Sequence, residues 1–460
     1  LRANPYLVVD TALFEKSTDI KKTVIPHSML NLPEQNKSTV IAGLTRNPPA
    51  RSENEEIAAQ GRNDTNIFKE QLLALIPDLD AQCDGVLIHS ENFQALGLMQ
   101  EKYREQVKCV YIDPPYNSPS SEIAYKNSYK HSSWLSLMND RISLSQSFLP
   151  KTPLIVAIDK HESNALEQML KGKFSDFSVD TIVVEHNKKG VQGNGFSYTH
   201  ENAIFVTFDD EKSINRRMLD EKDWEYDHLR NWGGESLRTD GRNCFYPIRV
   251  KNKKIIGFGD VSDDTFHPSS PNLIQDDGVI SIYPIDSKGV ERKWRYARDT
   301  VEGIIDWLQV EQDKDGIYNV KKAKADASFK TVWADSKYNA GDNGTKILTN
   351  MGFDSSFFDF PKSIFTVTDC INAVSKKTAE CLDYFGGSGT TAHAVINLNR
   401  EDNGSRKYIL VEQNAYFDTV LKPRIQKVVY SRDWKDGKPK PDDTGSLNGI
   451  SHCFKTIRLE

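Results

Sequence analysis

The sequence predicts an α/β protein with a doubly wound sheet, interrupted by an inserted region. Apolar runs of strand length alternate with segments of helical spacing on both sides of a less regular middle part. The chain has 460 residues, which favours one large α/β domain with an insertion over a single ordinary core. Hydrophobic residues make up 38% of it and charged residues 27%, and no apolar run approaches the roughly 20 residues of a membrane helix. We therefore expect a cytoplasmic protein.

The first part of the chain is weakly patterned and the rest is regular. Residues 1–14 form an extended N-terminal segment, and residues 15–65, rich in Lys, Ser, Asn, Glu and Pro without periodicity, predict a low-complexity, disordered insert. The expected elements after it are a helix over 68–76, a strand over 85–89, a helix over 93–103, a strand over 107–112, a helix over 131–149, strands over 154–158, 181–184 and 203–208, a strand over 381–385, a helix over 390–399 and a strand over 407–412.

The middle of the chain does not follow this alternation. Residues 211–350 contain short segments crowded with charge, aromatic residues and Gly, including Arg216-Arg217, Trp232-Gly233-Gly234 and Lys253-Lys254. This composition predicts a second domain, although an ordinary solvated surface would have a similar composition. Because the net charge of the whole chain is −6, any nucleic-acid contact requires a locally basic cleft.

The second half of the chain contains a glycine-rich turn between a strand and a helix. It reads Phe385-Gly386-Gly387-Ser388-Gly389-Thr390-Thr391, and the strand that follows the helix ends at Glu412. Glycines let the backbone pass close to a ligand, and an acid at the end of the next strand can accept hydrogen bonds from ribose hydroxyls. The pattern is not GxGxxG, which favours S-adenosylmethionine (SAM) over NAD or FAD. A tight structural turn remains the alternative.

A more specific motif follows the strand over 107–112. It reads Asp113-Pro114-Pro115-Tyr116, and the carboxyl end of a strand is where open α/β sheets bind their ligands. An exocyclic amine of adenine or cytosine is a poor nucleophile, because its lone pair is delocalised into the ring. Asp113 and the Pro114 carbonyl could accept its two N–H groups, with the prolines fixing that carbonyl, and Tyr116 could stack on a flipped base. The alternative is a Pro-Pro turn with an incidental Asp.

No other site is indicated by the sequence. The six cysteines form no CxxC pair and no Cys/His cluster of zinc spacing, so we expect reduced thiols and no metal site. His89, His131, His161, His186 and His200 are dispersed along the chain and predict no nucleophilic triad, so we expect them to be structural or surface residues.

At these motifs the chain resembles the amino-methyltransferases of bacterial restriction-modification systems, specifically the adenine methyltransferase (Mod) subunits of type III-like systems. In that family the DPPY motif precedes the FxGxG motif, an order called the β class, and the target-recognition region lies between the two. Asp113 precedes Phe385 here, with residues 211–350 in the intervening position. The resemblance also covers the segments 91–96, 131–136, 157–162, 360–363 and 394–399.

The resemblance implies a SAM-dependent methyltransferase fold with a Rossmann-like sheet and assigns its parts. Residues 66–210 would be the catalytic half, 211–350 the target-recognition region, 351–430 the SAM-binding half and 431–460 a C-terminal extension. Asp113, Pro114, Pro115 and Tyr116 would be catalytic, and Arg230, Arg238 and Arg242 would bind DNA. The residues that would bind SAM are Lys362, Asp383, Phe385, Gly386, Gly387, Ser388, Gly389, Thr390 and Glu412.

The implied activity is site-specific methylation of adenine N6 in double-stranded DNA. Two alternatives remain open: a cytosine N4 methyltransferase, and a truncated DNA-binding remnant without turnover. The resemblance also implies a restriction (helicase-nuclease) subunit and a second copy of the chain as partners, and no membrane. The opening Asn4-Pro5-Tyr6 resembles a point well inside longer polypeptides of the family, so we expect an N-terminal portion to be absent.

Overall fold

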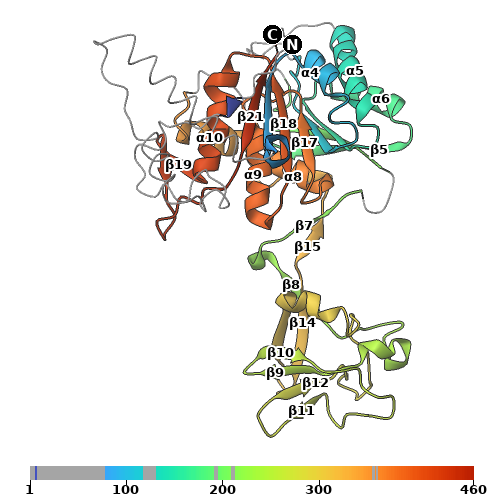
Figure 1. Ribbon diagram of the computed structural model, residues 1–460. Coiled ribbons are helices and arrows are strands. Elements are labelled where there is room, and N and C mark those ends of the chain that lie inside the picture. Colours follow the sequence, from blue (N-terminus) through green and yellow to red (C-terminus); the bar gives the residue numbers. More distant parts are fainter. Residues whose placement is uncertain are drawn as a thin grey trace. The chain divides into compact units, whose positions relative to one another are not determined.

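The computed structural model describes residues 6–7, 78–117, 131–190, 195–208, 213–354, 358 and 361–459. The predicted insert over 15–65 and the predicted helix over 68–76 lie outside these residues. The chain divides into two compact units: a main unit of residues 1–215 and 330–460, and a smaller unit of residues 216–329 (Figure 1). No helix in the described ranges is long and apolar enough to cross a membrane.

A ten-stranded sheet forms the centre of the main unit. Its neighbouring strands are parallel from β21 to β4, and β6 runs antiparallel to both of its neighbours. In order across the sheet the strands are β1 (Tyr6–Leu7), β21 (Phe454–Arg458), β2 (Gly85–His89), β18 (Lys407–Glu412), β17 (Glu380–Asp383), β3 (Val107–Ile112), β4 (Leu154–Ile158), β6 (His200–Phe208), β5 (Phe177–Glu185) and β16 (Val332–Trp333).

Two groups of helices pack against this sheet (Figure 1). Helix α5 contacts α4 and α6, and α9 contacts α8 and α10. The central strands are continuous apolar runs because both of their faces are covered, as the five buried residues of β4 illustrate. The helices are α3 (Leu79–Gln82), α4 (Asn92–Met99), α5 (His131–Phe148), α6 (Ser163–Lys173), α7 (Lys346–Asn350), α8 (Ile364–Val374), α9 (Thr390–Asp402) and α10 (Lys422–Tyr430), with a π-helical segment η10 (Phe417–Leu421) and a hairpin of β19 (Asp433–Lys435) and β20 (Lys438–Lys440).

The order of the strands reverses between β17 and β3. From β17 the chain continues to the neighbouring β18, whereas from β3 it continues to β4 on the opposite side. Such a reversal opens a crevice at the carboxyl ends of the two strands, which here are Asp383 and the residue after Ile112. Because β6 is antiparallel, its first residues lie at this same edge of the sheet. The predicted doubly wound α/β fold is confirmed.

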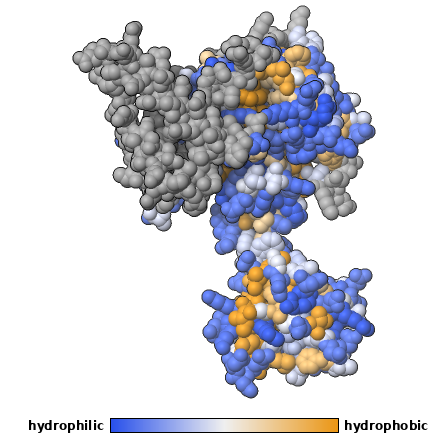
Figure 2. Space-filling view, viewed as in Figure 1, coloured by the Kyte–Doolittle hydropathy of each residue, from blue (hydrophilic) through white to orange (hydrophobic). Residues whose placement is uncertain are grey.

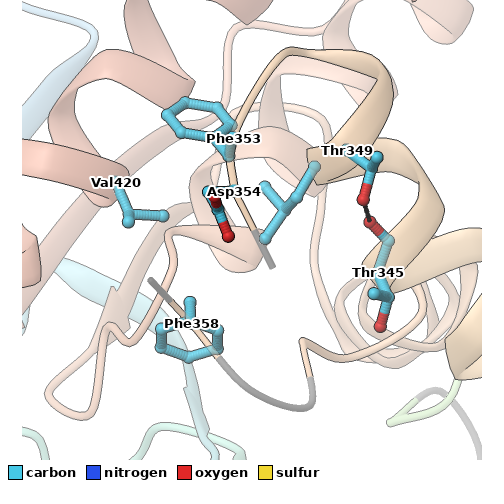
Figure 3. Close-up of a pocket in the computed structure, with 7 residues that line it drawn as sticks. Thr345, Thr349, Phe353, Asp354, Phe358 and Val420 are labelled. Atoms are coloured by element: carbon cyan, nitrogen blue, oxygen red, sulfur yellow. Dashed lines mark hydrogen bonds between the residues drawn. The ribbon is translucent and has the colours of Figure 1, made fainter. Parts of the chain in front are cut away.

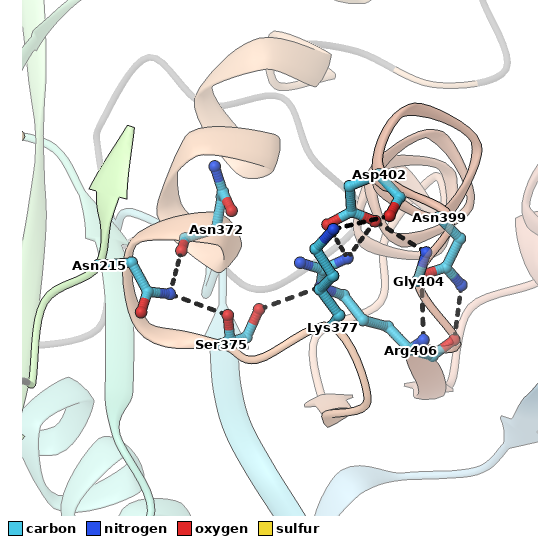
Figure 4. A network of polar contacts seen from close by, with 8 residues as sticks. All are labelled: Asn215, Asn372, Ser375, Lys377, Asn399, Asp402, Gly404 and Arg406. Atoms are coloured by element: carbon cyan, nitrogen blue, oxygen red, sulfur yellow. Dashed lines mark hydrogen bonds and ion pairs between the residues drawn. The ribbon is translucent and has the colours of Figure 1, made fainter. Parts of the chain in front are cut away.

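A buried polar network ties the ends of α8 and α9 to the start of β18 (Figure 4). The Arg406 guanidinium is 2% exposed and pairs with Asp402 at 2.9 Å. Asn399 both donates to the Arg406 carbonyl and accepts from its N–H. On the other side, the Asn215 amide donates to the carbonyls of Asn372 and Ser375 at 2.7 and 2.9 Å. The network satisfies helix-end carbonyls and fixes the point where the chain leaves the main unit.

The smaller unit is built from short antiparallel strands around its own core. Buried aromatic residues such as Tyr246 and Trp294 lie in that core, and the Trp294 indole donates to the Tyr246 carbonyl at 2.8 Å. Its strands are β7 (Arg216–Met218), β8 (Glu225–His228), β9 (Ile248–Lys251), β10 (Lys254–Phe258), β11 (Asn272–Ile274), β12 (Ile280–Ile282), β13 (Leu308–Gln312), β14 (Tyr318–Lys324) and β15 (Asp326–Ser328).

The boundaries of the smaller unit differ from those expected from composition. The unit ends at Phe329 rather than 350, because β16 and the helix α7 return to the main unit, where β16 pairs with β5. The expected C-terminal extension over 431–460 supplies β21, which pairs in parallel with β2.

Candidate functional site

The loop over 113–117 is held by contacts on both sides. The apolar strand β3 ends at Ile112, which places the loop at the crevice in the sheet. The Trp134 indole of α5 donates to the Pro115 carbonyl at 2.8 Å. Asn117 adopts a left-handed conformation with φ 54° and donates to the fully buried Glu162 carboxylate at 2.7 Å. Side chains outside the motif therefore fix the shape of the loop.

A compact polar cluster surrounds Asp113. The Lys362 ammonium lies 3.2 Å from Asp113 Oδ1 and 2.9 Å from Glu201 Oε2, and it also contacts the Tyr116 hydroxyl. The Tyr116 hydroxyl in turn donates to Glu201 Oε2 at 2.9 Å. Lys362 stands just before α8 and Glu201 near the start of β6, so distant parts of the sequence meet at this edge of the sheet.

Burial and the charge of Lys362 shift the pKa values of the two carboxylates in this cluster in opposite directions. Burial raises the pKa of Asp113, while the Lys362 ammonium partly opposes that rise. Burial also tends to raise the pKa of Glu201, but Lys362, His186 and the Tyr116 hydroxyl together hold it below its ordinary value. The two carboxylates outweigh the effect of burial on Lys362 and raise its pKa. Lys362 is therefore a buried ammonium with two carboxylate neighbours.

The glycine-rich turn lies beside the first loop and uses two left-handed glycines. Gly387 has φ 52° and Gly389 has φ 84°, conformations that residues with a Cβ rarely adopt. The Gly387 N–H donates to Glu412 Oε2 at 2.8 Å, and Glu412 Oε1 accepts the N–H groups of Gln413 and Asn414 at 2.9 Å. Glu412 at the end of β18 thus fastens the turn.

Asp383 is the last residue of β17 and lies just before the glycine-rich turn. Its carboxylate accepts the Phe385 N–H at 2.9 Å and the Thr391 hydroxyl at 2.5 Å. Burial raises the pKa of Asp383 to about 7, although these two donors favour the anion, and the nearby carboxylates of Asp113 and Glu412 add to the rise. Asp383 pairs with no basic side chain among the described residues, which makes it a suitable neighbour for a cationic ligand.

Arg424 supports the same turn from behind. This fully buried side chain of α10 donates to the Ser388 hydroxyl at 2.8 Å and to the Thr390 hydroxyl at 2.9 Å. It also contacts the His393 ring at 3.4 Å, and burial lowers the pKa of Arg424 to about 9. No sequence pattern indicates this role, because Arg424 stands 36 residues after Ser388 in an amphipathic helix.

One cavity of about 770 Å³ joins the two motifs. Its lining includes every residue predicted to be catalytic and all of the predicted cofactor residues except Gly389, which packs toward Leu421 and Ile425. Thr345 and Phe358 border both this cavity and a small neighbouring pocket, where Phe353 and Val420 also lie (Figure 3). The residues predicted from sequence that line the cavity are Asp113, Pro114, Pro115, Tyr116, Lys362, Asp383, Phe385, Gly386, Gly387, Ser388, Thr390 and Glu412.

Several cavity residues were not predicted from the sequence. Glu201 is the main one, and His161, His186 and His200, which the sequence predicts to be structural or surface residues, also line the cavity. The only signal for Glu201 is an acidic residue just before the apolar run over 203–208. Placing it at the site requires knowing that β6 is antiparallel.

The three arginines predicted to bind DNA lie in the smaller unit and differ in exposure. Arg238 is 8% exposed, pairs with Glu291 at 3.0 Å and donates to the carbonyls of Phe266 and Asp263. Arg230 is partly buried and donates to the Ile285 carbonyl. Both donate to carbonyls within the unit, and of the two only Arg238 is buried. Arg242, with a side chain 74% exposed, pairs at 3.0 Å with the exposed Asp264.

Comparison with known proteins gives a consistent result. Residues 107–422 match a family model described as DNA methylase, N6_N4_Mtase. The type II methyltransferase M.KpnI of Klebsiella pneumoniae is 30% identical over 374 residues, which are 75% of this chain and 84% of that protein. The type III restriction-modification enzyme EcoPI Mod subunit of Escherichia phage P1 is 26% identical over 440 residues, which are 81% of this chain and 65% of that protein. Among solved structures, an M1.HpyAVI–SAM complex is 12% identical, with a TM-score of 0.34 over 74% of this chain and 98% of that chain.

Proposed function

The chain belongs to the DNA methylase family, and from this membership we propose that it transfers a methyl group from SAM to the N6 atom of adenine at specific sites in double-stranded DNA. The observation that carries the proposal is the single cavity that brings the Asp113 loop and the glycine-rich turn together. An acceptor for an exocyclic amine and a turn suited to a nucleotide-type cofactor share this space.

The residues of the cavity fit SAM. The acidic residues among its described lining are Asp113, Asp159, Glu201, Asp383 and Glu412. The lysines there are Lys160 and Lys362, and the histidines are His161, His186 and His200. The excess of negative charge suits a cationic cofactor. When bound, SAM supplies a methyl group on a sulfonium, which needs no further activation. We assign Gly386, Gly387 and Ser388 to the backbone around it, and Asp383 and Glu412 to its positive and hydroxyl groups.

The Asp113 loop would act on the target amine. Asp113 accepts one N–H and the Pro114 carbonyl accepts the other, so the nitrogen lone pair turns away from the base ring. The nitrogen then bonds to the methyl carbon as the carbon–sulfur bond breaks, and that bonding pair stays on sulfur. The charged nitrogen loses one proton, to Asp113 or to water. Orientation of the two reactants supplies most of the rate.

Affinity for SAM should rise with pH because of Asp383. The pKa of this buried acid is raised to about 7, and a bound cation favours its anionic form. Binding is therefore weakened below the pKa, strengthens as the pH rises through it and levels off above it, by about tenfold between pH 6 and pH 8. Calorimetric titration at several pH values measures the effect. Asp383→Asn should flatten the curve, and a wild-type affinity independent of pH would contradict the assignment.

DNA contact is proposed for the exposed basic residues of the smaller unit. Arg242 is joined there by the exposed side chains of Arg249, Lys251, Lys253 and Lys254. The hydrophilic surface of this unit also carries apolar patches (Figure 2). The side chains of Trp232 and Ile274 in this unit are exposed. Basic side chains supply phosphate contacts, and apolar or aromatic ones can meet the bases.

Two arginine variants should separate DNA contact from folding. Arg242→Ala should weaken DNA binding and reduce the slope of log affinity against log salt by about one, because one phosphate contact is lost. Arg238→Ala should instead destabilise the smaller unit by about 2–4 kcal/mol, because buried carbonyls and Glu291 lose their partner. Fluorescence anisotropy at several salt concentrations, together with thermal unfolding, measures both effects. An unchanged salt slope for Arg242→Ala would remove it from the interface.

The protein partners that we propose are inferred from proteins similar to this chain. The chain spans 65% of the EcoPI Mod subunit and 57% of the StyLTI Mod subunit of Salmonella typhimurium. Both of these are subunits of type III restriction-modification enzymes. We propose a restriction (helicase-nuclease) subunit as a partner and a second copy of the chain as a further one. Co-purification with such a subunit and light scattering of the chain alone would test the two proposals.

The test of the activity is transfer of tritiated methyl from SAM to unmodified bacterial DNA. Nucleoside analysis of the product should show the label in N6-methyladenine. Label in N4-methylcytosine would replace the adenine assignment with the cytosine alternative. SAM binding without any label in DNA would support a remnant that has lost turnover.

A further inference from the structure

The Lys362 side chain occupies the catalytic side of the cavity. Its ammonium lies 3.2 Å from Asp113 Oδ1 and 4.2 Å from the centroid of the Tyr116 ring. Under the proposed function these two groups receive the amine and the ring of the target base. A positive charge therefore stands at both of the groups that have to recognise the base.

Glu201 fixes the other side of this ammonium. It is 5% exposed, and strand pairing of β6 with β5 sets its backbone position opposite Val184. Its Oε2 atom lies 2.9 Å from the Lys362 ammonium and accepts the Tyr116 hydroxyl at 2.9 Å. A buried carboxylate requires such partners, because desolvation of an unpaired charge is strongly unfavourable. Glu201 thus holds both Lys362 and Tyr116.

Resting on the proposed function, we propose that Glu201 and Lys362 are positioning residues for methyl transfer. Lys362 supplies one ammonium, which Asp113 and Glu201 share. This ammonium keeps Asp113 an anion, and Glu201 keeps Tyr116 oriented for the target base. Neither residue needs to touch the transferred methyl group. Their effect reaches the amine through Asp113 and Tyr116.

The charges around Asp113 explain why the ammonium is needed. Burial and the neighbouring Glu201 carboxylate both favour the protonated form of Asp113, and Lys362 is the cation that opposes them. A protonated Asp113 carries an O–H donor and loses acceptor capacity for the amine. The titratable groups that face Asp113 or its two partners are Tyr111, Tyr116, His186, Glu201, Lys362, Cys370 and Asp383.

Replacing Lys362 and replacing Glu201 should shift the pKa of Asp113 in opposite directions. Lys362→Met removes the cation, so the pKa of Asp113 should rise by about one unit or more. Glu201→Gln removes a negative charge but keeps an oxygen that accepts from the ammonium, so the pKa of Asp113 should fall. A role confined to packing would give no such pair of opposite shifts.

The first measurement is a pH titration of the free protein labelled with carbon-13 at the aspartate carboxyl carbons. Loss of one resonance in Asp113→Asn identifies the carboxyl of interest. The expected result is an upward shift of its pKa in Lys362→Met, a downward shift in Glu201→Gln and a value close to wild type in Lys362→Arg. An unchanged pKa in Lys362→Met, or an unchanged or raised pKa in Glu201→Gln, overturns the proposal. This measurement needs neither SAM nor DNA.

The second measurement is the pH profile of methyl transfer at saturating SAM and DNA. The rate should fall on the acidic side of this profile. The midpoint of that fall should move to higher pH in Lys362→Met and return to the wild-type position in Lys362→Arg. Lys337→Met is the matched control, because it removes an ammonium that pairs with Asp369 at 2.7 Å and does not line the cavity. Its profile should match that of the wild type. A midpoint that does not move in Lys362→Met overturns the positioning role.

The two measurements separate the possible failures. A wild-type chain that transfers no methyl group would refute the proposed function. The carboxyl titration would still decide whether Asp113 and Glu201 share the Lys362 ammonium. An active wild type with an unshifted carboxyl in Lys362→Met would refute the positioning role alone.

Discussion

Asp113→Ala should lower the rate of methyl transfer at least about 1,000-fold, which corresponds to about 4 kcal/mol of transition-state stabilisation. Under the proposed function, the variant removes the carboxylate that accepts the amine N–H and that is one of the two acceptors for the departing proton. Affinity for SAM should change only a few-fold, because the glycine-rich turn is fastened by Glu412 and Arg424 and not by Asp113. Single-turnover transfer of tritiated methyl, together with calorimetric SAM titration, measures both quantities.

Asp180→Ala is the matched control for this prediction. Asp180 is exposed on β5 of the same sheet and does not line the cavity. Its variant should transfer methyl at close to the wild-type rate. A rate for Asp113→Ala within tenfold of the wild type would remove Asp113 from the reaction.

Glu412→Gln should weaken SAM binding by about 10- to 100-fold, or about 1.4–2.7 kcal/mol. The substitution keeps the size of the side chain, but one carboxylate oxygen becomes an NH₂ group. The carboxylate accepts backbone N–H groups on both oxygens, one of them from Gly387, so an NH₂ group would meet a donor on either side. Hydrogen bonds to a charged acceptor are also stronger than those to an amide. Calorimetric titration at constant pH measures the loss.

Glu401→Gln provides the comparison for Glu412→Gln. Glu401 is exposed near the end of α9, the helix that begins at the turn. Its variant should bind SAM as the wild type does. Equal affinities for the two variants would mean that the Glu412 charge has no part in holding the turn.

Most of the central sheet could be predicted because its strands are buried on both faces. The expected strand over 107–112 and helix over 131–149 agree with β3 and α5 to within one residue. Helix α4 is shorter than the expected 93–103, because it ends at Met99 and the residues that follow form turns. Continuous apolar runs and clear helical periodicity are signals that do not depend on distant neighbours.

Strands β21 and β16 could not be predicted, because their identity depends on pairing. Strand β21 contains Lys455 and Thr456 and does not read as an apolar run, yet it pairs in parallel with β2. Strand β16 has two residues, too few for any periodic signal. Both join the sheet through backbone hydrogen bonds to a neighbour far away in the sequence.

The site was predictable where its chemistry depends on contiguous residues. The Asp113 loop and the glycine-rich turn are local motifs, and the structure brings both to one cavity. Glu201 and Arg424 act from separate elements, and only the antiparallel direction of β6 and the packing of α10 reveal them. For Arg238 the sequence predicts a DNA contact from the charged segment around it, and the structure adds that its guanidinium donates to carbonyls within the unit.

The antiparallel pairing of β7 with β15 bears on how such a chain could change in evolution. Arg216 lies opposite Ser328 in this pair, so the smaller unit begins and ends at neighbouring points. A segment with adjacent ends can be exchanged as a cassette without altering the path of the chain on either side. Asn215 precedes the exchange point, and the loop over 113–117 and the glycine-rich turn lie outside the exchanged segment. If the smaller unit contacts DNA as proposed, recombination at these two positions would change its DNA contacts and leave the residues of the cavity unchanged.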